Sequence, residues 1–316
     1  MANSNDNRFL NSDYGRKSKV WVVVATHKAF PMPTDKMYIP LHVGAEGKVN
    51  EDGTPLDLGY QKDNTGDNIS ERNPQFCELT GLYWAWKNLN ADYIGLVHYR
   101  RYFQGTAVMP EARTGVYNAV KGLDEKTDKW IASRFNNILT YKQLRPLLDK
   151  YKVIVPKKRH YYIETLHQHY EHNHYIKELD TAKEIMLEKY PEYKAAYDKA
   201  INRTWGYMFN MMILDKKLMD EYCEWLFDIL FELSSRMENE ASELGRELTG
   251  FENRFPGRVS ERIFNVWLEH QLETGHIKPS EIKEIPFMYM EKINLLNKGV
   301  TFLRAKFTGK KPEKSF

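Results

Sequence analysis

The chain has 316 residues, and its 46 Lys and Arg nearly balance its 43 Asp and Glu, leaving a formal net charge of +3. A net charge this small does not predict nucleic-acid binding. A content of 42% hydrophobic residues is enough for a sizeable core. No run of about 18 apolar residues occurs, so no membrane-spanning helix is predicted. The opening MANSNDNRFLNSDYGRKSK has no apolar core and does not predict a signal peptide.

The first half of the chain predicts two strands, a long loop and a helix. Residues 1–18 are expected to be a flexible lead-in. KVWVVVATHK (19–28) predicts a buried strand, and MYIPLHVGAEG (37–47) a strand and a turn. Residues 50–75 are rich in Asp, Asn and Gly and predict a loop long enough to be functional or mobile. Residues 75–90 predict a helix, because apolar side chains recur on one face at Phe76, Leu79, Tyr83 and Trp86.

The second half continues the alternation of strands and helices. In order, it predicts a strand over 93–99, a helical or loop insertion over 111–150, a strand over 151–156, helices over 160–200 separated near Pro191, a strand over 206–214, a helix over 216–237, and a helix over 260–273 with Ser260 as its N-cap. This order predicts a single α/β domain over 19–290, with a mainly parallel central sheet flanked by helices. Ligands of such sheets bind beyond the carboxyl ends of the strands.

The segment YIGLVHYRRYF (93–103) begins as a buried strand and ends in His98, Arg100 and Arg101. One guanidinium group can donate two parallel hydrogen bonds to phosphate oxygens. Two arginines beside a histidine at a strand end therefore suit a diphosphate. A salt-bridged surface strand end is the alternative, and the residue types alone leave both open. Thr26 and His27 end the first strand and are expected at the same edge.

The segment HYYIETLHQHYEHNH is rich in histidine, at His160, His167, His169, His172 and His174. Zinc could use several of these, but no HExxH spacing occurs, which favours a solvated or substrate-facing helix surface over a metal site. Imidazoles also hydrogen-bond sugar hydroxyls, so an acceptor site is a third option. The chain has no Walker A, GxGxxG, GxSxG or CxxC motif.

Two further features concern the environment of the protein. Cys77 and Cys223 lie in apolar helical patterns, which favours buried thiols and a reducing cytoplasm over a disulfide. The tail, residues 291–316, has six basic residues and one acidic residue from Lys298 onward, with apolar residues between them. Such a tail lies on an anionic membrane surface or forms a solvated, partly disordered end, and the sequence leaves both open.

Several blocks of the sequence together resemble one bacterial family, catalogued as domain of unknown function 4422. In chain order they are YIPLHVGAEG, DNTGDNIS, NPQFCELTGLYWAWKN, YIGLVHYRRYF, FNMMIL, YCEWLF and SERIFNVWL. Members of this family resemble glycosyltransferases of capsular polysaccharide and exopolysaccharide synthesis, some of them linked to galactofuranose transfer. The resemblance implies a GT-A-like fold, in which a nucleotide-sugar-binding α/β sheet joins an acceptor-binding half.

The resemblance also implies roles for single residues. GT-A enzymes usually hold a metal with an Asp-x-Asp motif, but here that place reads His98-Tyr99-Arg100. We therefore expect His98, Arg100 and Arg101 to replace the metal, so that no cofactor is required; the alternative is Mn²⁺ or Mg²⁺ with His98 as a ligand. The other donor-binding residues implied by position are Thr26, His27, Asp67, Asn68, Glu78, Trp84 and Asn210, with core packing the alternative for Trp84.

An inverting transferase needs a carboxylate that deprotonates the acceptor hydroxyl. By position in the resemblance, Glu261 is the first candidate and Asp180 the second, although Glu261 would also stabilise the dipole at a helix start. His172 and His174 are the expected acceptor-binding residues.

The function implied is transfer of galactofuranose or galactose from a UDP-sugar to a lipid-linked saccharide in capsule, exopolysaccharide or O-antigen synthesis. The protein would be cytoplasmic, or peripheral on the inner face of the cell membrane through its tail. The alternative is a non-catalytic nucleotide-sugar or glycan-binding protein on the same scaffold.

Overall fold

The computed structural model of the chain describes residues 19–106, 117–118 and 125–291. The predicted lead-in over 1–18, and the predicted tail apart from Glu291, therefore lie outside the described residues. Among the helices that are described, none combines the length and the hydropathy needed to cross a membrane.

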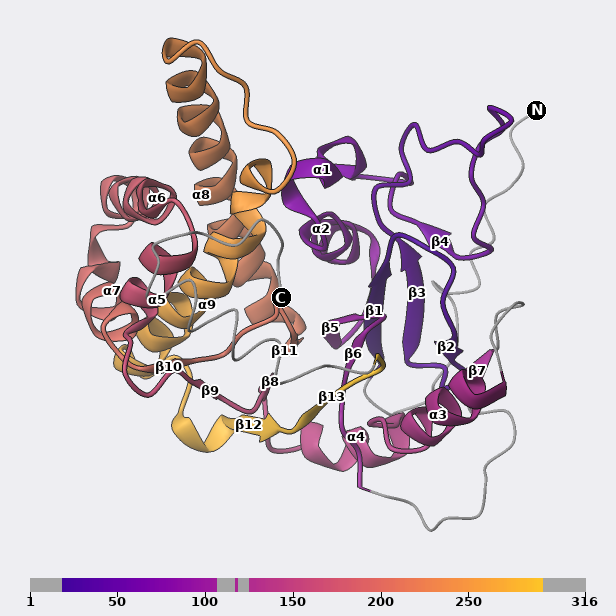
Figure 1. The fold of residues 1–316 in the computed structure, drawn as a ribbon. Coiled ribbons are helices and arrows are strands. Elements are labelled where there is room, and N and C mark those ends of the chain that lie inside the picture. The colour runs from indigo at the N-terminus through magenta and orange to yellow at the C-terminus, as the bar shows by residue number, and fades with distance from the viewer. Residues whose placement is uncertain (1–18, 107–116, 119–124, 292–316) are drawn as a thin grey trace.

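The described strands form one large sheet and two small ribbons (Figure 1). They are β1 Val20–Thr26, β2 Met32–Pro33, β3 Tyr38–His42, β4 Gln61–Lys62, β5 Tyr93–His98, β6 Arg101–Phe103, β7 Tyr117–Asn118, β8 Val153–Pro156, β9 Arg159–His160, β10 Trp205–Gly206, β11 Met212–Asp215, β12 Ile282–Ile285 and β13 Phe287–Tyr289.

The large sheet has the strand order β12-β8-β11-β5-β1-β3-β4, with β6 and β13 attached beside β5. Strands β5, β1, β3 and β4 run parallel to one another, and β12 runs parallel to β8. Strand β11 is antiparallel to both β5 and β8, so it is the reversed strand along this described path. The carboxyl ends of β1 and β5 consequently meet at one edge, where Ala25 lies opposite His98.

The described helices cover both faces of the sheet. They are α1 Asn73–Phe76, α2 Leu79–Asn88, α3 Glu125–Phe135, α4 Tyr141–Leu148, α5 Leu166–Asn173, α6 Ile176–Lys189, α7 Lys194–Ile201, α8 Lys216–Glu243 and α9 Phe255–Glu273, with short 3₁₀ turns at Ser70–Arg72, Pro191–Tyr193, Glu252–Arg254 and Pro279–Glu281. Figure 1 shows α3 and α4 below the sheet, whereas α5 to α9 gather on the other side.

Two buried clusters explain why β1 has no polar face. Trp21, Val23 and Ala25 pack with α2, α8 and α9, whereas Val22 and Val24 pack with α3 and α4. Alternate side chains of a strand point to opposite faces, so a strand covered on both sides must be apolar throughout. The predicted α/β fold with a mainly parallel central sheet is therefore confirmed.

Three local predictions were wrong in detail. The helix over 75–90 is broken at Cys77, which takes a φ of 51° between α1 and α2. The strand over 206–214 is two short strands joined by a turn over 207–211. Helix α9 begins at Phe255, so Ser260 lies inside the helix and is not its N-cap.

Candidate functional site

The centre of the site is Glu78, which links the start of α2 to the end of β5. Its Oε1 accepts a hydrogen bond of 2.7 Å from Nδ2 of Asn210 and lies 3.6 Å from Nε2 of His98. Burial alone would raise the pKa of Glu78, but the imidazole of His98 and the hydrogen bonds outweigh it and lower the pKa to about 2. Three segments far apart in the sequence thus converge on one carboxylate, whose side chain is 14% exposed.

Asn210 is held by a second set of contacts from α9. Its Oδ1 accepts a hydrogen bond of 2.9 Å from Oγ of Ser260, and its Nδ2 also donates to the carbonyl of Gly257 at 3.1 Å. Phe209 and Asn210 both adopt left-handed backbone conformations, with φ of 77° and 49°. Such conformations are costly for a residue such as Phe and persist where the surroundings impose them, commonly at functional sites.

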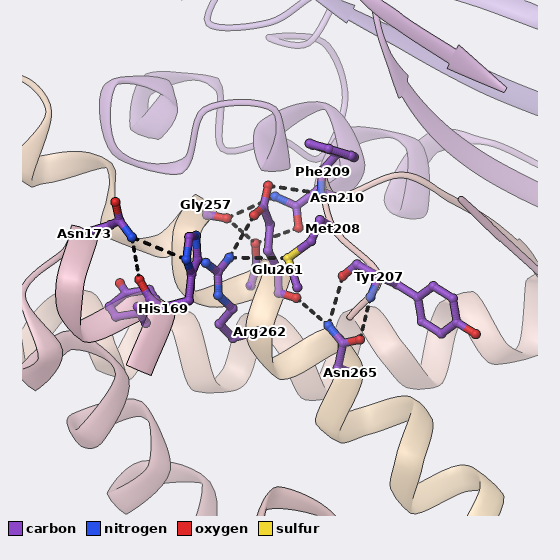
Figure 2. Close-up of polar contacts among 12 residues, drawn as sticks. His169, Asn173, Tyr207, Met208, Phe209, Asn210, Gly257, Glu261, Arg262 and Asn265 are labelled. Atoms are coloured by element: carbon purple, nitrogen blue, oxygen red, sulfur yellow. Dashed lines mark hydrogen bonds and ion pairs between the residues drawn. The ribbon is translucent and has the colours of Figure 1, made fainter. Parts of the chain in front are cut away.

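Glu261 lies one turn of α9 beyond Gly257 and faces the same turn (Figure 2). Its Oε1 accepts a hydrogen bond of 3.1 Å from the backbone N–H of Phe209, and its Oε2 pairs with Nη1 of Arg262 at 3.0 Å. The side chain is 24% exposed, whereas that of Arg262 is 4% exposed. A carboxylate fixed from two sides yet open to solvent suits proton transfer.

Asn265 of α9 binds the other end of the same turn, at Tyr207. Its amide accepts from the backbone N–H of Tyr207 at 2.8 Å and donates to the carbonyl of Tyr207 at 2.9 Å (Figure 2). The position of Glu261 relative to Asn210 is therefore set by backbone and amide contacts.

Cationic side chains surround this group where β1 and β5 end. His27 is exposed, but partial desolvation of its ring lowers its pKa, and the nearby Lys28, Arg100, His98 and Arg254 lower it further. Each of these groups therefore lies near enough to His27 to repel a proton on its ring. The electrostatics of this edge favour an anion.

Arg101 has a different environment from Arg100. Its guanidinium lies 4.6 Å from the ring of Phe209 and 5.4 Å from that of Tyr289. Nη1 of Arg100 lies 3.6 Å from Oε2 of Glu291, a half-exposed pair. Among the described residues no carboxylate pairs with Arg101, so its charge is available to a ligand, and the two rings lie against its guanidinium.

The histidine-rich segment is organised by Glu164, a carboxylate that the sequence analysis did not single out. Its two oxygens lie 3.1 Å from Nδ1 of His169 and 3.0 Å from Nδ1 of His172. Burial and the charge of Arg262 lower the pKa of His169 to about 4, so this imidazole is neutral at pH 7. His172 is 44% exposed, whereas His174 packs edge-on against Tyr170.

Asp180 lies apart from these groups. It is on α6, half-exposed, and its carboxylate is 3.8 Å from Nε2 of His167 on α5. No contact of the described residues connects it to Glu78 or Glu261.

The remaining predicted donor residues have local structural contacts. Thr26 is buried and bonds the backbone of Lys28. Asp67 accepts from the hydroxyl of Tyr83, and Asn68 bonds Gly66 and Ser70 within its own loop. Trp84 is 5% exposed within the core, and its ring N–H donates to Thr65, so the core-packing alternative fits its position.

The long loop before α1 is anchored by Asp63, another residue that the sequence analysis missed. This fully buried carboxylate accepts from the backbone N–H groups of Gly44 and Ala45 and from the hydroxyls of Ser70 and Thr80. Its isolated position within a polar loop carried no periodic signal. Glu164 has a local signal of another kind: the following Thr165-x-x-Gln168 forms a capping box, which marks a helix start.

No group of three or more His, Cys, Asp or Glu side chains in the described part of the chain is arranged to hold a metal ion. Cys77 and Cys223 are free thiols, and burial raises the pKa of Cys77 to about 12.

Taken with the fold, this geometry defines an α/β protein with a group of cationic side chains at the carboxyl ends of its central parallel strands. The chain belongs to the family described as Domain of unknown function (DUF4422), which it matches over residues 21–272. Among solved structures, it is similar to the WbbM bifunctional glycosyltransferase in its apo form, with 29% sequence identity and a TM-score of 0.67. That match covers 87% of this chain and 46% of the other, so the chain spans about half the length of that enzyme. No curated protein matches the chain.

Proposed function

We propose that the protein is a glycosyltransferase that transfers galactofuranose or galactose from a UDP-sugar to a lipid-linked saccharide acceptor. Its product would belong to capsule, exopolysaccharide or O-antigen synthesis. The observation that carries the proposal is the convergence of His27, His98, Arg100 and Arg101 at the ends of β1 and β5, beside the turn that contacts Glu261. The family and the likeness to a glycosyltransferase support the same assignment.

The cationic groups would bind and stabilise the diphosphate of the donor. As the bond from the anomeric carbon to the diphosphate oxygen breaks, negative charge grows on the departing UDP. Arg101, whose guanidinium lies against the rings of Phe209 and Tyr289, offers a planar pair of donors to phosphate oxygens. Glu78 would keep the imidazole of His98 in position without contacting the donor itself.

We further propose that this transfer requires no metal ion. His98 and Arg100 stand where GT-A enzymes usually have the two carboxylates of the Asp-x-Asp motif. A guanidinium group repels a divalent cation and cannot replace a carboxylate as its ligand. Transfer should therefore persist in excess EDTA. Complete loss in EDTA, with recovery on adding Mn²⁺ or Mg²⁺, would assign the charge stabilisation to an ion instead.

Glu261 is the proposed catalytic base of an inverting reaction. The acceptor hydroxyl would attack the anomeric carbon from the face opposite the diphosphate and pass its proton to a carboxylate oxygen of Glu261. The Phe209 N–H binds one lone pair of Oε1, and Arg262 binds one lone pair of Oε2. Each oxygen keeps a further lone pair that can accept a proton. Asp180 has no comparable link to the donor edge, so we assign it no step.

The acceptor side is proposed to include His172, whose ring is fixed by Glu164 and half-exposed. His174 is proposed to line the same side through its contact with Tyr170. The acceptor would reach the enzyme at the inner face of the cell membrane, and the basic tail would contact the anionic lipids there.

A thermal-shift screen of nucleotide sugars, followed by measurement of UDP release, tests the assignment. A donor stabilises the folded state in proportion to its occupancy, and an enzyme also releases UDP slowly by transferring the sugar to water. Stabilisation without any UDP release, with or without saccharide acceptors, would favour the non-catalytic binding protein. Absence of stabilisation by every nucleotide sugar would contradict both functions.

A further inference from the structure

The loop between β9 and α5 exposes two large apolar side chains side by side. Tyr162 is 84% exposed and Ile163 is 69% exposed, whereas the preceding Tyr161 is 8% exposed. Burying such side chains is favourable, so an adjacent exposed pair is a candidate contact surface.

The backbone around the pair is anchored, so its exposure is not a consequence of a loose chain. Tyr161 donates its N–H to the carbonyl of Thr204, and its ring lies 4.1 Å from that of His169. Strand β9 pairs with β10 immediately before it. Tyr162 then takes a φ of 59°, a left-handed conformation that is costly for a tyrosine. The fold thus imposes strain at the residue that projects from the surface.

Basic residues precede the pair in the chain. Lys157, Arg159 and His160 are exposed, and no ion pair joins Lys157 or Arg159 to a carboxylate of the described residues. The acidic residue that follows, Glu164, is 2% exposed and faces His169 and His172. The solvent side of the loop therefore combines basic groups with an apolar tip.

We propose that this tip, formed by Lys157, Arg159, His160, Tyr162 and Ile163, docks the protein on an anionic lipid bilayer. Basic side chains are attracted to anionic headgroups, and a tyrosine ring suits the membrane interface, where one end is apolar and the other is hydrated. Two projecting side chains are too small for a stable protein interface, which buries at least about 1,200 Å² in total. A bilayer needs no such matched surface.

The position of the tip adds membrane docking to the proposed function. This inference depends on the proposed function only in taking the acceptor to be lipid-linked. The residue after Ile163 is Glu164, which fixes His172 on the proposed acceptor side. Docking there would place the acceptor histidines next to the membrane that holds the acceptor. This contact is separate from the tail over 291–316, and weak surface contacts anchor proteins stably when two act together.

Co-sedimentation of the full chain with vesicles tests the proposal. The vesicles are phosphatidylethanolamine with phosphatidylglycerol, and phosphatidylcholine alone serves as the neutral comparison. The double variant Tyr162→Asn with Ile163→Ser removes the apolar tip while keeping a residue that tolerates the left-handed backbone. The matched control is Leu244→Ser, which removes an exposed apolar residue, 64% accessible, at the end of α8.

We expect the double variant to weaken binding to anionic vesicles about tenfold or more, while Leu244→Ser binds like the wild type. Neutralising Lys157 and Arg159 to Gln should weaken it roughly fivefold per residue, with no such effect on neutral vesicles. Thermal stability should not fall, and UDP release without vesicles should not change. A failure of the proposed enzymatic function would therefore appear in UDP release and not in vesicle binding.

Equal binding by the wild type and the double variant would overturn the proposal, as would absence of binding by the wild type. A double variant that binds vesicles normally but changes its oligomeric state in sedimentation velocity would overturn it in favour of a contact between copies of the chain.

Discussion

Glu78 keeps its negative charge at a place where burial opposes it. The His98 imidazole and the Asn210 amide supply the compensation, and they lower the pKa of Glu78 from 4.5 to about 2. A carboxyl whose pKa is lower in the folded state stabilises that state above its unfolded pKa, and this contribution disappears as the pH falls through the folded pKa. At neutral pH the contribution of Glu78 is thus fully present.

The variant Glu78→Gln should lower the free energy of unfolding at pH 7 by on the order of 3 kcal/mol, because a shift of one pKa unit is worth about 1.4 kcal/mol. The deficit relative to wild type should shrink as the pH falls from about 4.5 to about 2, as Glu78 becomes protonated. Denaturant titrations of both proteins across this range measure the difference. A deficit that stays constant with pH would mean that the charge of Glu78 is not what stabilises the site.

The variant Glu261→Gln should reduce sugar transfer about 100-fold or more, because the amide cannot accept the proton of the attacking hydroxyl. Its carbonyl oxygen can still accept from the Phe209 N–H, so donor affinity should stay near the wild-type value. Glu273→Gln, on the last turn of the same helix, is the matched control. Transfer by Glu261→Gln at the rate of that control would remove Glu261 from the mechanism.

At the scale of elements, the turn between β10 and β11 is the least predictable part of the site. Nothing in the sequence YMFNM signals two consecutive left-handed residues, and its apolar side chains predict a strand. The turn forms because Asn265 and Asn210 bind it to α9, which are contacts between segments about 50 residues apart in the chain.

Replacing Asn210 separates the conformational role of the residue from its hydrogen bonds. Asn210→Ala loses the side-chain hydrogen bonds and also the tolerance of a positive φ. Asn210→Gly loses the hydrogen bonds but adopts a positive φ freely. We expect the glycine variant to be about 1–2 kcal/mol more stable than the alanine variant, measured by thermal or denaturant unfolding. An alanine variant as stable as the glycine variant would show that the backbone there is not constrained.

The contact between β5 and β11 depends on Gly95. A Cβ atom added there would lie 2.7 Å from Cγ1 of Ile213 and 3.0 Å from the carbonyl of Met212. Gly95→Ala should therefore destabilise the protein by about 1–3 kcal/mol. Gly257→Ala, whose Cβ would meet no atom nearer than 3.9 Å inside α9, should be neutral or stabilising by up to about 1 kcal/mol. Equal melting temperatures would contradict this packing.

Elements with strong local patterns could be predicted from the sequence, because their periodicity matches their burial. The strand β1 and the helix α8 are of this kind. The start of α9 was missed although Pro256 stands in its first turn, a common signal of a helix start. At the site, the cationic end of β5 could be read from the sequence, whereas the contacts of Glu164, Asp63 and Asn265 depend on tertiary neighbours.

At the scale of the whole molecule, the two proposed binding regions lie on different elements. The cationic groups lie where β1 and β5 end, whereas the histidines lie on α5, among the helices that pack on one face. Arg262 joins the two regions, since it pairs with Glu261 and its charge acts on His169 (Figure 2). A base between a donor region and an acceptor region is the arrangement that direct transfer requires.

The rate of UDP release from nucleotide sugars, compared between the wild type and Arg101→Gln, tests this account most directly. The matched control is Arg145→Gln on α4, where the guanidinium pairs with Asp149 on the surface. We predict that the wild type and the control release UDP equally, and that Arg101→Gln is slower by about 100-fold, as expected for the loss of one charge-stabilising donor. Equal rates for all three proteins, or no UDP release by the wild type from any nucleotide sugar, would contradict the assignment of this edge as a glycosyltransferase donor site.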